Sequence, residues 1–292
     1  MSERRERAAA VRVAQQRKER QRTMVVGLVI AALLLVGGIA VAWQAAQTSK
    51  AKADAKAQEQ LASKQFITTL TSIPGATFDA AGAPSKAPKA PTKLAGASAM
   101  TAGKLPRVVY VGAEYCPYCA MQRWPLVAAL SRFGTFDGLA PALSSSNEGA
   151  VSNIATITFR DATFTSDYLA FEGWEIQDRD QQPLQTLPDD VDAFVKKYDV
   201  PPLSSPSPGS IPFIGYGGQW ASAGATFDGG LLVGKTNGQI VTEMKDPTTD
   251  LGKAALQEAN VITAQLCVLT KNQPGEVCSS KAVVSASRLL NK

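Results

Sequence analysis

Apolar and polar residues follow distinct patterns along the chain, and these patterns predict strands and helices in a particular order. Residues 108–111 form a continuous apolar run typical of a buried strand, and residues 120–133 carry apolar side chains at helical spacing. Residues 154–159 are rich in β-branched side chains and predict a second strand. We therefore expect a strand, a helix and a second strand in the first half of a globular domain.

The second half of this domain is predicted to hold two helices and a strand that begins at a proline. Residues 188–198 begin with proline and two aspartates, a typical helix start, and residues 251–269 form a longer amphipathic helix. Pro212 interrupts the apolar run 211–214, and we expect its peptide bond to be cis, since a cis bond turns the chain at a strand entrance. A trans proline that opens the strand is the alternative. Residues 163–187 show no regular period and are interpreted as an irregular insertion.

The N-terminal residues predict a membrane anchor. Residues 24–43 contain no charged side chain, and twenty residues form a helix of about 30 Å, the thickness of a bilayer core. Residues 1–23 hold eight basic and three acidic residues, while the rest of the chain is neutral overall. We expect this tail to be cytoplasmic and all that follows the helix to be extracytoplasmic. A cleaved signal peptide is the alternative, although its apolar core is usually about 7 to 15 residues long.

A low-complexity region separates the predicted anchor from the globular domain. Residues 44–103 are rich in Ala, Lys, Gln, Pro and Gly, and we expect them to form a stalk and linker. The domain is then predicted at 104–292. The pattern leaves open whether Ile67, Leu70 and Ile73 pack on the domain or only on the stalk.

Two cysteines directly after the first predicted strand carry the clearest chemistry in the chain. Cys116 and Cys119 enclose Pro117 and Tyr118 at the junction of a strand and a helix. A helix N-terminus stabilises a thiolate at the first cysteine, and proline suits the first helical position because its missing N–H is not needed there. This context favours a redox-active pair over a zinc knuckle.

Metal sites find little support. The chain has no histidine, which excludes imidazole ligands and Ser-His-Asp or Cys-His catalysis. A four-cysteine zinc site would need Cys267 and Cys278, which are eleven positions apart, whereas zinc pairs usually lie about two to four apart. Binding of Cu(I) by the two thiolates is a further alternative, but no methionine cluster accompanies them. We expect neither a metal nor a cofactor.

Cys267 and Cys278 are expected to form a structural disulfide. The residues between them include Asn272, Pro274 and Gly275, a composition typical of a loop. An even number of cysteines outside the cytoplasm suits one redox pair and one structural bridge. A second redox centre that relays electrons to Cys116 is the alternative.

The order of elements resembles the thioredoxin-like fold, and individual residues resemble one family more closely. The order is carried by residues 108–130 and 211–217. Over roughly residues 65 to 280 the chain is similar to the domain of unknown function 929 family, a group with a thioredoxin-like core behind a membrane anchor. The stretches that carry this similarity are Val109–Ala120, Arg123-Trp124, Ser131–Gly134, Tyr168, Ile211–Phe213, Ala259-Asn260, Cys267, Pro274 and Cys278.

This resemblance implies roles for the residues around the motif. Cys116 would be the attacking thiol, Cys119 the resolving thiol, and Pro212 the cis-proline that faces the substrate. We expect the neighbouring side chains to shape a substrate groove, and these are Tyr115, Tyr118, Ile211 and Phe213. Tyr110 departs from the thioredoxin pattern, which has a buried aspartate there, so no carboxylate is predicted to handle the proton of Cys119.

The predicted fold is therefore α/β: a thioredoxin-like domain with an insertion, behind a single transmembrane helix and a stalk. The predicted function is that of a membrane-tethered, extracytoplasmic thiol–disulfide oxidoreductase. Its partners would be envelope proteins with thiols or disulfides and a redox protein in the membrane. We expect no binding to nucleic acid. The alternative is a thioredoxin-like envelope module that binds or assembles partners without redox activity.

Overall fold

The computed structural model describes residues 63–87, 89–204 and 206–290, together with Lys18, Met24, Gln44, Gln47 and Thr48. The chain divides into two compact units, Met1–Leu61 and Ala62–Lys292. The predicted transmembrane segment at 24–43 lies almost entirely outside the described residues. Among the helices that the structure does describe, none combines the length and the apolar character needed to cross a membrane.

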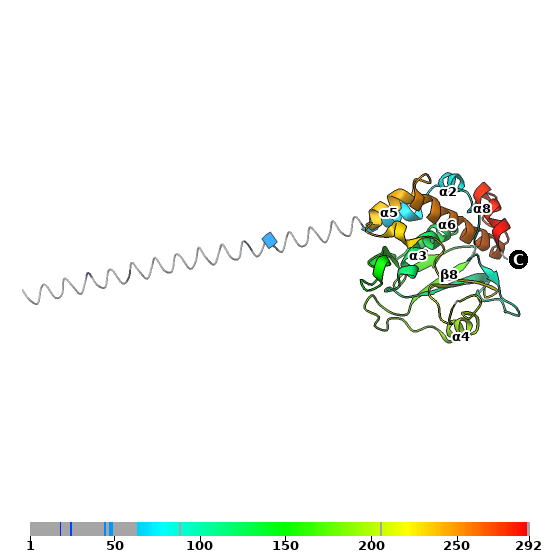
Figure 1. Ribbon diagram of the computed structural model, residues 1–292, viewed down its shortest axis with the longest axis horizontal. Helices are drawn as coiled ribbons and strands as arrows, with labels where there is room; N and C mark the ends of the chain where they lie inside the picture. Colours follow the sequence, from blue (N-terminus) through cyan, green and yellow to red (C-terminus); the bar gives the residue numbers. More distant parts are fainter. Residues whose placement is uncertain are drawn as a thin grey trace, which may run out of the picture. The chain divides into compact units, whose positions relative to one another are not determined.

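The second unit is a mixed α/β fold around a six-stranded central sheet (Figure 1). The central strand β3 pairs in parallel with β8 and antiparallel with β9, so the sheet is mixed. The remaining strands extend it in the order β1, β10, β9, β3, β2. The strands are β1 (Thr92–Lys93), β2 (Thr101–Ala102), β3 (Leu105–Gly112), β8 (Ala170–Glu175), β9 (Phe213–Tyr216) and β10 (Trp220–Ala223).

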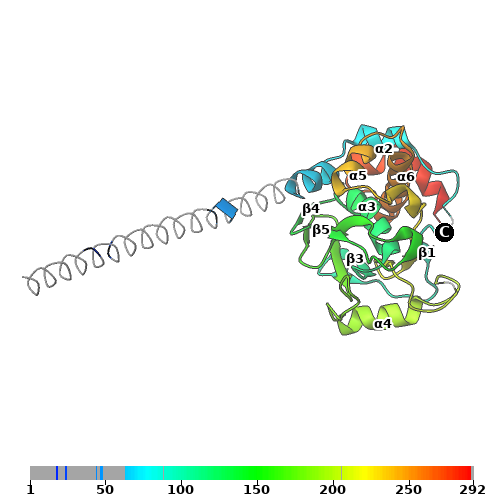
Figure 2. The ribbon, with the colours of Figure 1, turned by 60° about the vertical axis from the view of Figure 1, so that its left-hand side comes forward.

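Helices cover both faces of this sheet because β3 is apolar on both. Successive strand residues point to opposite faces. Val108 and Tyr110 belong to the main core, and Val109 and Val111 pack with Val191 of α4 on the other face. Both views place α4 alone on one side and the other labelled helices opposite (Figure 2). The helices are α2 (Gly75–Ala81), α3 (Pro117–Leu130), α4 (Asp189–Tyr198), α5 (Asn237–Met244), α6 (Asp250–Leu269), α7 (Gly275–Cys278) and α8 (Lys281–Ala286).

The predicted strand at 154–159 forms, but outside the central sheet. It is β6 (Ala155–Thr158), which pairs with β5 (Ala140–Leu143) in a two-stranded ribbon. A second ribbon joins β4 (Thr135–Asp137) and β7 (Thr163–Thr165). Three short 3₁₀ turns complete the unit, at Gly149–Val151, Gly229–Leu232 and Ser287–Leu289.

The region 163–187 differs from the predicted irregular insertion, because it contains β8, the parallel neighbour of β3. This strand was not predicted because two glutamates, Glu172 and Glu175, interrupt the apolar pattern of a buried strand. Glu172 pairs with Arg107 at 2.6 Å, and Glu175 is buried against Arg123. Charges that are satisfied by partners on other elements do not mark solvent exposure, so the pattern alone is misleading here.

The compact unit also starts earlier than the predicted boundary at residue 104. A helix at 63–71, α2 and the short connection between them place four large side chains in the core, namely Phe66, Leu70, Ile73 and Phe78. The buried amide of Asn260 on α6 donates to the carbonyl oxygens of Phe78 and Gly82, both at 2.9 Å. Part of the predicted stalk and linker therefore belongs to the folded unit, and the question of whether Leu70 and Ile73 pack on the domain is resolved in its favour.

Candidate functional site

The first cysteine of the motif lies at the start of α3. Cys116 is the residue that caps this helix, and its sulfur accepts a hydrogen bond from the backbone N–H of Cys119 at 3.3 Å. Pro117 occupies the first turn, as expected. The hydrogen bond from the Cys119 side chain lowers the pKa of Cys116, with help from backbone N–H groups and from the charge of Arg123, although burial opposes the shift. Cys116 is therefore prepared to act as a thiolate.

The second cysteine is held in the opposite state. Cys119 is fully buried one helical turn further on. Burial raises the pKa of its thiol well above the ordinary value, and the neighbouring Cys116 raises it further. The proton is therefore held less tightly at Cys116 than at an ordinary thiol and more tightly at Cys119, and both cysteines are free in this structure.

The chain segment before β9 lies directly beside the first cysteine. The Ile211–Pro212 peptide is cis. The thiol of Cys116 donates to the Ile211 carbonyl oxygen, with 3.7 Å between sulfur and oxygen. The tertiary structure thus brings together the three residues that the resemblance singles out, although 95 positions separate Cys116 from Ile211.

Two of the four predicted groove residues lie at a cavity beside this site. Tyr118 is 53% exposed, and it lines a cavity of about 580 Å³ together with Ile211. Phe213 is instead fully buried and packs edge-on against Phe194 of α4, so it does not line a groove. Tyr115 packs against the core, and its carbonyl oxygen accepts the N–H of Ser145. The expectation for Phe213 is wrong because it is a strand residue that points to the α4 face.

A buried ion pair beneath the motif was not found from the sequence. Arg123 on α3 donates to both carboxylate oxygens of Glu175 on β8, at 2.9 and 2.5 Å, and both side chains are fully buried. Its guanidinium also donates to the Ala113 carbonyl oxygen at 2.8 Å, just before the motif. Burial disfavours the charged guanidinium, but Glu175, Tyr110 and Cys119 together outweigh it and raise the pKa of Arg123. The pair ties α3 to the central sheet and places a permanent charge near both thiols.

Tyr110 completes this buried cluster. Its ring lies 5.8 Å from the Arg123 guanidinium and makes an edge contact with Phe159. Its hydroxyl has no hydrogen-bond partner among the described residues, and the same holds for Nη1 of Arg123. Both charges of the ion pair act on the Cys119 thiol: Arg123 lowers its pKa and Glu175 raises it, with burial as the larger effect. Glu175 on β8 is thus a buried carboxylate whose charge acts on the Cys119 thiol.

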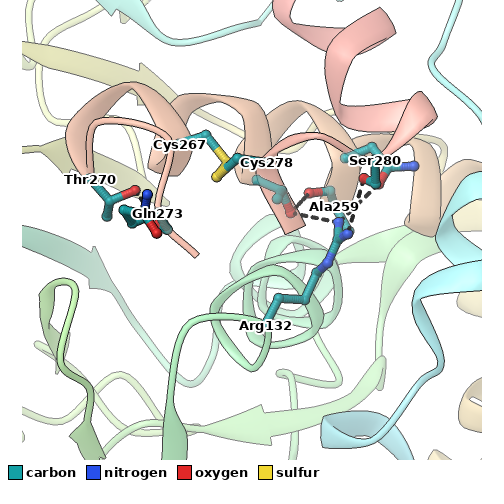
Figure 3. Close-up of a disulfide and its surroundings, with 9 residues drawn as sticks. Arg132, Ala259, Cys267, Thr270, Gln273, Cys278 and Ser280 are labelled. Atoms are coloured by element: carbon teal, nitrogen blue, oxygen red, sulfur yellow. Dashed lines mark hydrogen bonds between the residues drawn. A yellow bond between two sulfur atoms is a disulfide. The ribbon is translucent and has the colours of Figure 1, made fainter. Parts of the chain in front are cut away.

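The second pair of cysteines forms the predicted disulfide. Cys267 and Cys278 have Cα atoms 5.6 Å apart and join the end of α6 to α7 (Figure 3). Arg132 lies close by in the same view and donates to Asn260, Thr263 and Ser280, each at 3.3 Å. The bridge engages both sulfurs, so the four-thiolate zinc site is not formed. The described residues contain no group of three or more His, Cys, Asp or Glu side chains placed to hold a metal ion.

Comparison with known proteins gives one match. The family model described as a domain of unknown function, DUF929, matches residues 93–268, which is more than half of the chain. No curated protein and no solved structure matches the chain. The matched range includes Cys116, Cys119 and Pro212 together with Arg123 and Glu175.

Proposed function

This chain belongs to the domain of unknown function 929 (DUF929) family, and we propose that it is a thiol–disulfide oxidoreductase. The observation that carries the proposal is the opposite treatment of the two thiols in one helical turn. The pKa of Cys116 is lowered and that of the buried Cys119 is raised. This asymmetry, which the start of α3 and the burial of Cys119 produce, is what an exchange reaction needs, because such a reaction uses one attacking thiolate and one protonated partner.

The reaction follows from these states. The Cys116 thiolate attacks one sulfur of a substrate disulfide, which forms a mixed disulfide and releases the other substrate sulfur as a thiolate. Cys119 then loses its proton and attacks the Cys116 sulfur, which releases the second substrate sulfur. Two electrons pass from the protein dithiol to the substrate disulfide. The same steps in reverse transfer the Cys116–Cys119 disulfide to a substrate dithiol.

We also infer a thioredoxin-like core. Three features support this inference: the motif lies between β3 and α3, a parallel strand flanks β3, and a cis-proline precedes the β9–β10 hairpin. Function does not follow from such a fold alone, so the thiol chemistry carries the proposal and the fold only agrees with it.

The proposed setting is the outer face of a membrane. The uncharged run 24–43 behind a basic tail supports a single anchor with the redox domain outside the cytoplasm. A disulfide between Cys267 and Cys278 suits an oxidising compartment, which favours donation of disulfides to envelope proteins. A membrane redox protein would then reoxidise the cysteine pair.

The proposal is tested by trapping and by redox titration of the full-length protein. A Cys119→Ser variant is expected to accumulate mixed disulfides with envelope proteins, because nothing resolves the Cys116 adduct, whereas Cys116→Ser traps none. The pair is expected to titrate reversibly between about −270 and −120 mV, the range of known exchange enzymes. A pair that does not titrate, together with a Cys119→Ser variant that traps nothing, would overturn the enzyme and favour a binding module.

A further inference from the structure

The cavity beside Cys116 continues away from the redox site. Its walls come from the motif, from the segment before β9 and from the loop that follows α4. A second cavity of about 540 Å³ adjoins it and shares four lining residues with it, namely Lys89, Pro202, Leu203 and Ala223. We call the two cavities together the trough. One end lies at Tyr118 and Ile211, and the other lies at residues 92–95 around β1.

The walls of the trough are mainly apolar at the end near β1 and mixed at the end near Tyr118, where Ser204 and Ser210 also line it, and its charged side chains are basic. Prolines 201, 202 and 206 and Leu203 line it from the loop after α4, and Leu94 and Ala223 contribute further apolar surface. Among the described residues, the charged side chains that line the trough are Lys89 and Lys93. No acidic side chain lines either of these two cavities in that part of the chain, so the trough combines apolar surface with positive charge.

Lys89 occupies the middle of the trough. It lines both cavities, and its Nζ lies beside Gly224, where an added Cβ would come within 2.4 Å of it. Lys89 is exposed and forms no salt bridge within the described part of the chain, although it also lines a third, smaller cavity together with Glu258. A ligand carboxylate placed at the centre of the trough would therefore meet this ammonium group.

The loop that forms the proline-rich wall is held in place. Asp199 is only 2% exposed at the end of α4, and its carboxylate accepts from the Ser204 hydroxyl and from the backbone of Ser210. The N–H of Gly209 donates to the Asp199 carbonyl oxygen at 3.0 Å. Both ends of the wall are thus anchored to one residue, which suits a preformed site rather than one made on binding.

We propose that the trough binds an extended polypeptide segment that flanks the substrate cysteine, and that Lys89 selects segments with an acidic side chain among apolar ones. This inference rests on the proposed function, because it places the substrate cysteine at Cys116. Each cavity alone has the volume of a small-molecule pocket, and the two adjoin, so together they offer room for several residues of an extended chain beside Cys116. A small acidic thiol such as glutathione would fill one end only.

The test uses the full-length reduced protein and synthetic peptides with one central cysteine, blocked as a disulfide with a chromogenic thiol. The flanks are Ala and Leu, with Glu, Gln or Lys placed three to five positions from the cysteine on either side. Release of the chromogenic thiol gives the rate constant for each peptide. We expect a preference of about two- to fivefold for Glu over Lys, the range of an exposed ion pair. Lys89→Glu should reverse this preference, whereas Lys104→Glu, at an exposed lysine outside the trough, should leave it unchanged.

A neutral small disulfide separates the two proposals. If the protein reacts with the neutral disulfide but shows equal rate constants for Glu and Lys peptides, the trough inference is wrong and the proposed oxidoreductase function is unaffected. If no disulfide reacts at all, the proposed function fails first. A Lys89→Glu variant that slows the neutral disulfide as much as the peptides would show a structural role and overturn the inference. Faster reaction of a glutathione mixed disulfide than of any peptide would also overturn it.

Discussion

At the scale of single residues, the site depends on how two thiols of the same kind are given different proton affinities. Cys116 gains hydrogen bonds at the start of a helix, while Cys119 loses water inside the core. The first change stabilises the thiolate and the second destabilises it. The difference follows from position along one helical turn and requires neither a histidine nor a metal.

The alkylation of the two cysteines should therefore differ in its pH dependence. In a Cys119→Ser variant, the introduced hydroxyl can replace the Cys119 thiol as a hydrogen-bond donor, and the backbone N–H groups and Arg123 remain. The rate at which iodoacetamide modifies Cys116 is therefore expected to rise with a midpoint below the ordinary pKa of a cysteine thiol. In Cys116→Ser, Cys119 should react slowly up to high pH, since burial raises its pKa. Mass spectrometry at a series of pH values measures both rates. Equal profiles for the two thiols would contradict the assignment of roles.

The Arg123–Glu175 pair allows a prediction about stability and thiol chemistry together. Removal of one partner leaves a buried charge unpaired, so Arg123→Met and Glu175→Gln should each lower the free energy of unfolding, Arg123→Met by about 3–5 kcal/mol. Arg123→Met should also raise the pKa of Cys116, because the guanidinium stabilises its thiolate. Denaturant unfolding and the alkylation profile measure the two effects.

The double variant Arg123→Met/Glu175→Leu is the matched control for this pair. It removes both charges and should recover most of the lost stability, while the pKa of Cys116 stays raised. A double variant as unstable as the sum of the single ones would show that the two side chains do not act as a pair.

At the scale of elements, the loop between α4 and β9 links stability to pH. Burial raises the pKa of Asp199 to about 6, and the Ser210 N–H lowers it by less. The unfolded chain has an aspartate pKa of about 3.9. Because the folded state holds the proton more tightly, the contribution of Asp199 to the free energy of unfolding is complete below pH 4 and is lost as pH rises to about 6.

Asp199→Asn should remove this pH dependence while it keeps a side-chain acceptor for Ser204. The stability of the variant relative to the wild type is expected to increase by about 2 kcal/mol between pH 4 and pH 7. Denaturant unfolding at four pH values gives this difference directly. Asp137→Asn, at an exposed position on β4, is the control and should show a smaller change. A difference that stays constant with pH would mean that Asp199 does not titrate in this window.

At the scale of the whole molecule, the boundary of the folded unit is the main correction to the sequence pattern. Residues 63–93 are rich in small and polar residues, but they supply a helix, α2 and β1 to one core and one sheet. Their few large apolar side chains are spaced among Ala, Thr and Ser, so the composition resembles that of a linker. Burial, rather than composition, decides that they belong to the domain.

Two truncated chains should distinguish the predicted and observed boundaries. A chain that starts at Ala62 should unfold cooperatively, because it contains the whole compact unit. A chain that starts at Lys104 loses Phe66, Leu70 and Phe78 from the core, each worth about 1.5–3 kcal/mol of burial, together with β1. Such a loss is comparable to the entire stability of a typical domain. Circular dichroism during heating measures both transitions, and a cooperative transition in the shorter chain would contradict the observed boundary.

The sequence by itself determined the features that depend on neighbouring residues. The strand before the motif, the helix that begins at Pro117, the helix at 189–198 and the long helix before Cys267 all follow from local spacing and capping. The disulfide between Cys267 and Cys278 could also be predicted from the sequence, because only a short loop separates the two cysteines. Each of these features depends on residues that are close to one another in the sequence.

Only the tertiary structure decided which distant residues share an environment. It brought Ile211 to Cys116, placed Phe213 on the α4 face, and paired Arg123 with Glu175 across 52 positions. It also turned β8 into the parallel neighbour of β3. The physical reason is the same in each case: a charge or an aromatic ring has no fixed meaning in a sequence, because its free energy depends on whether a partner from another element meets it.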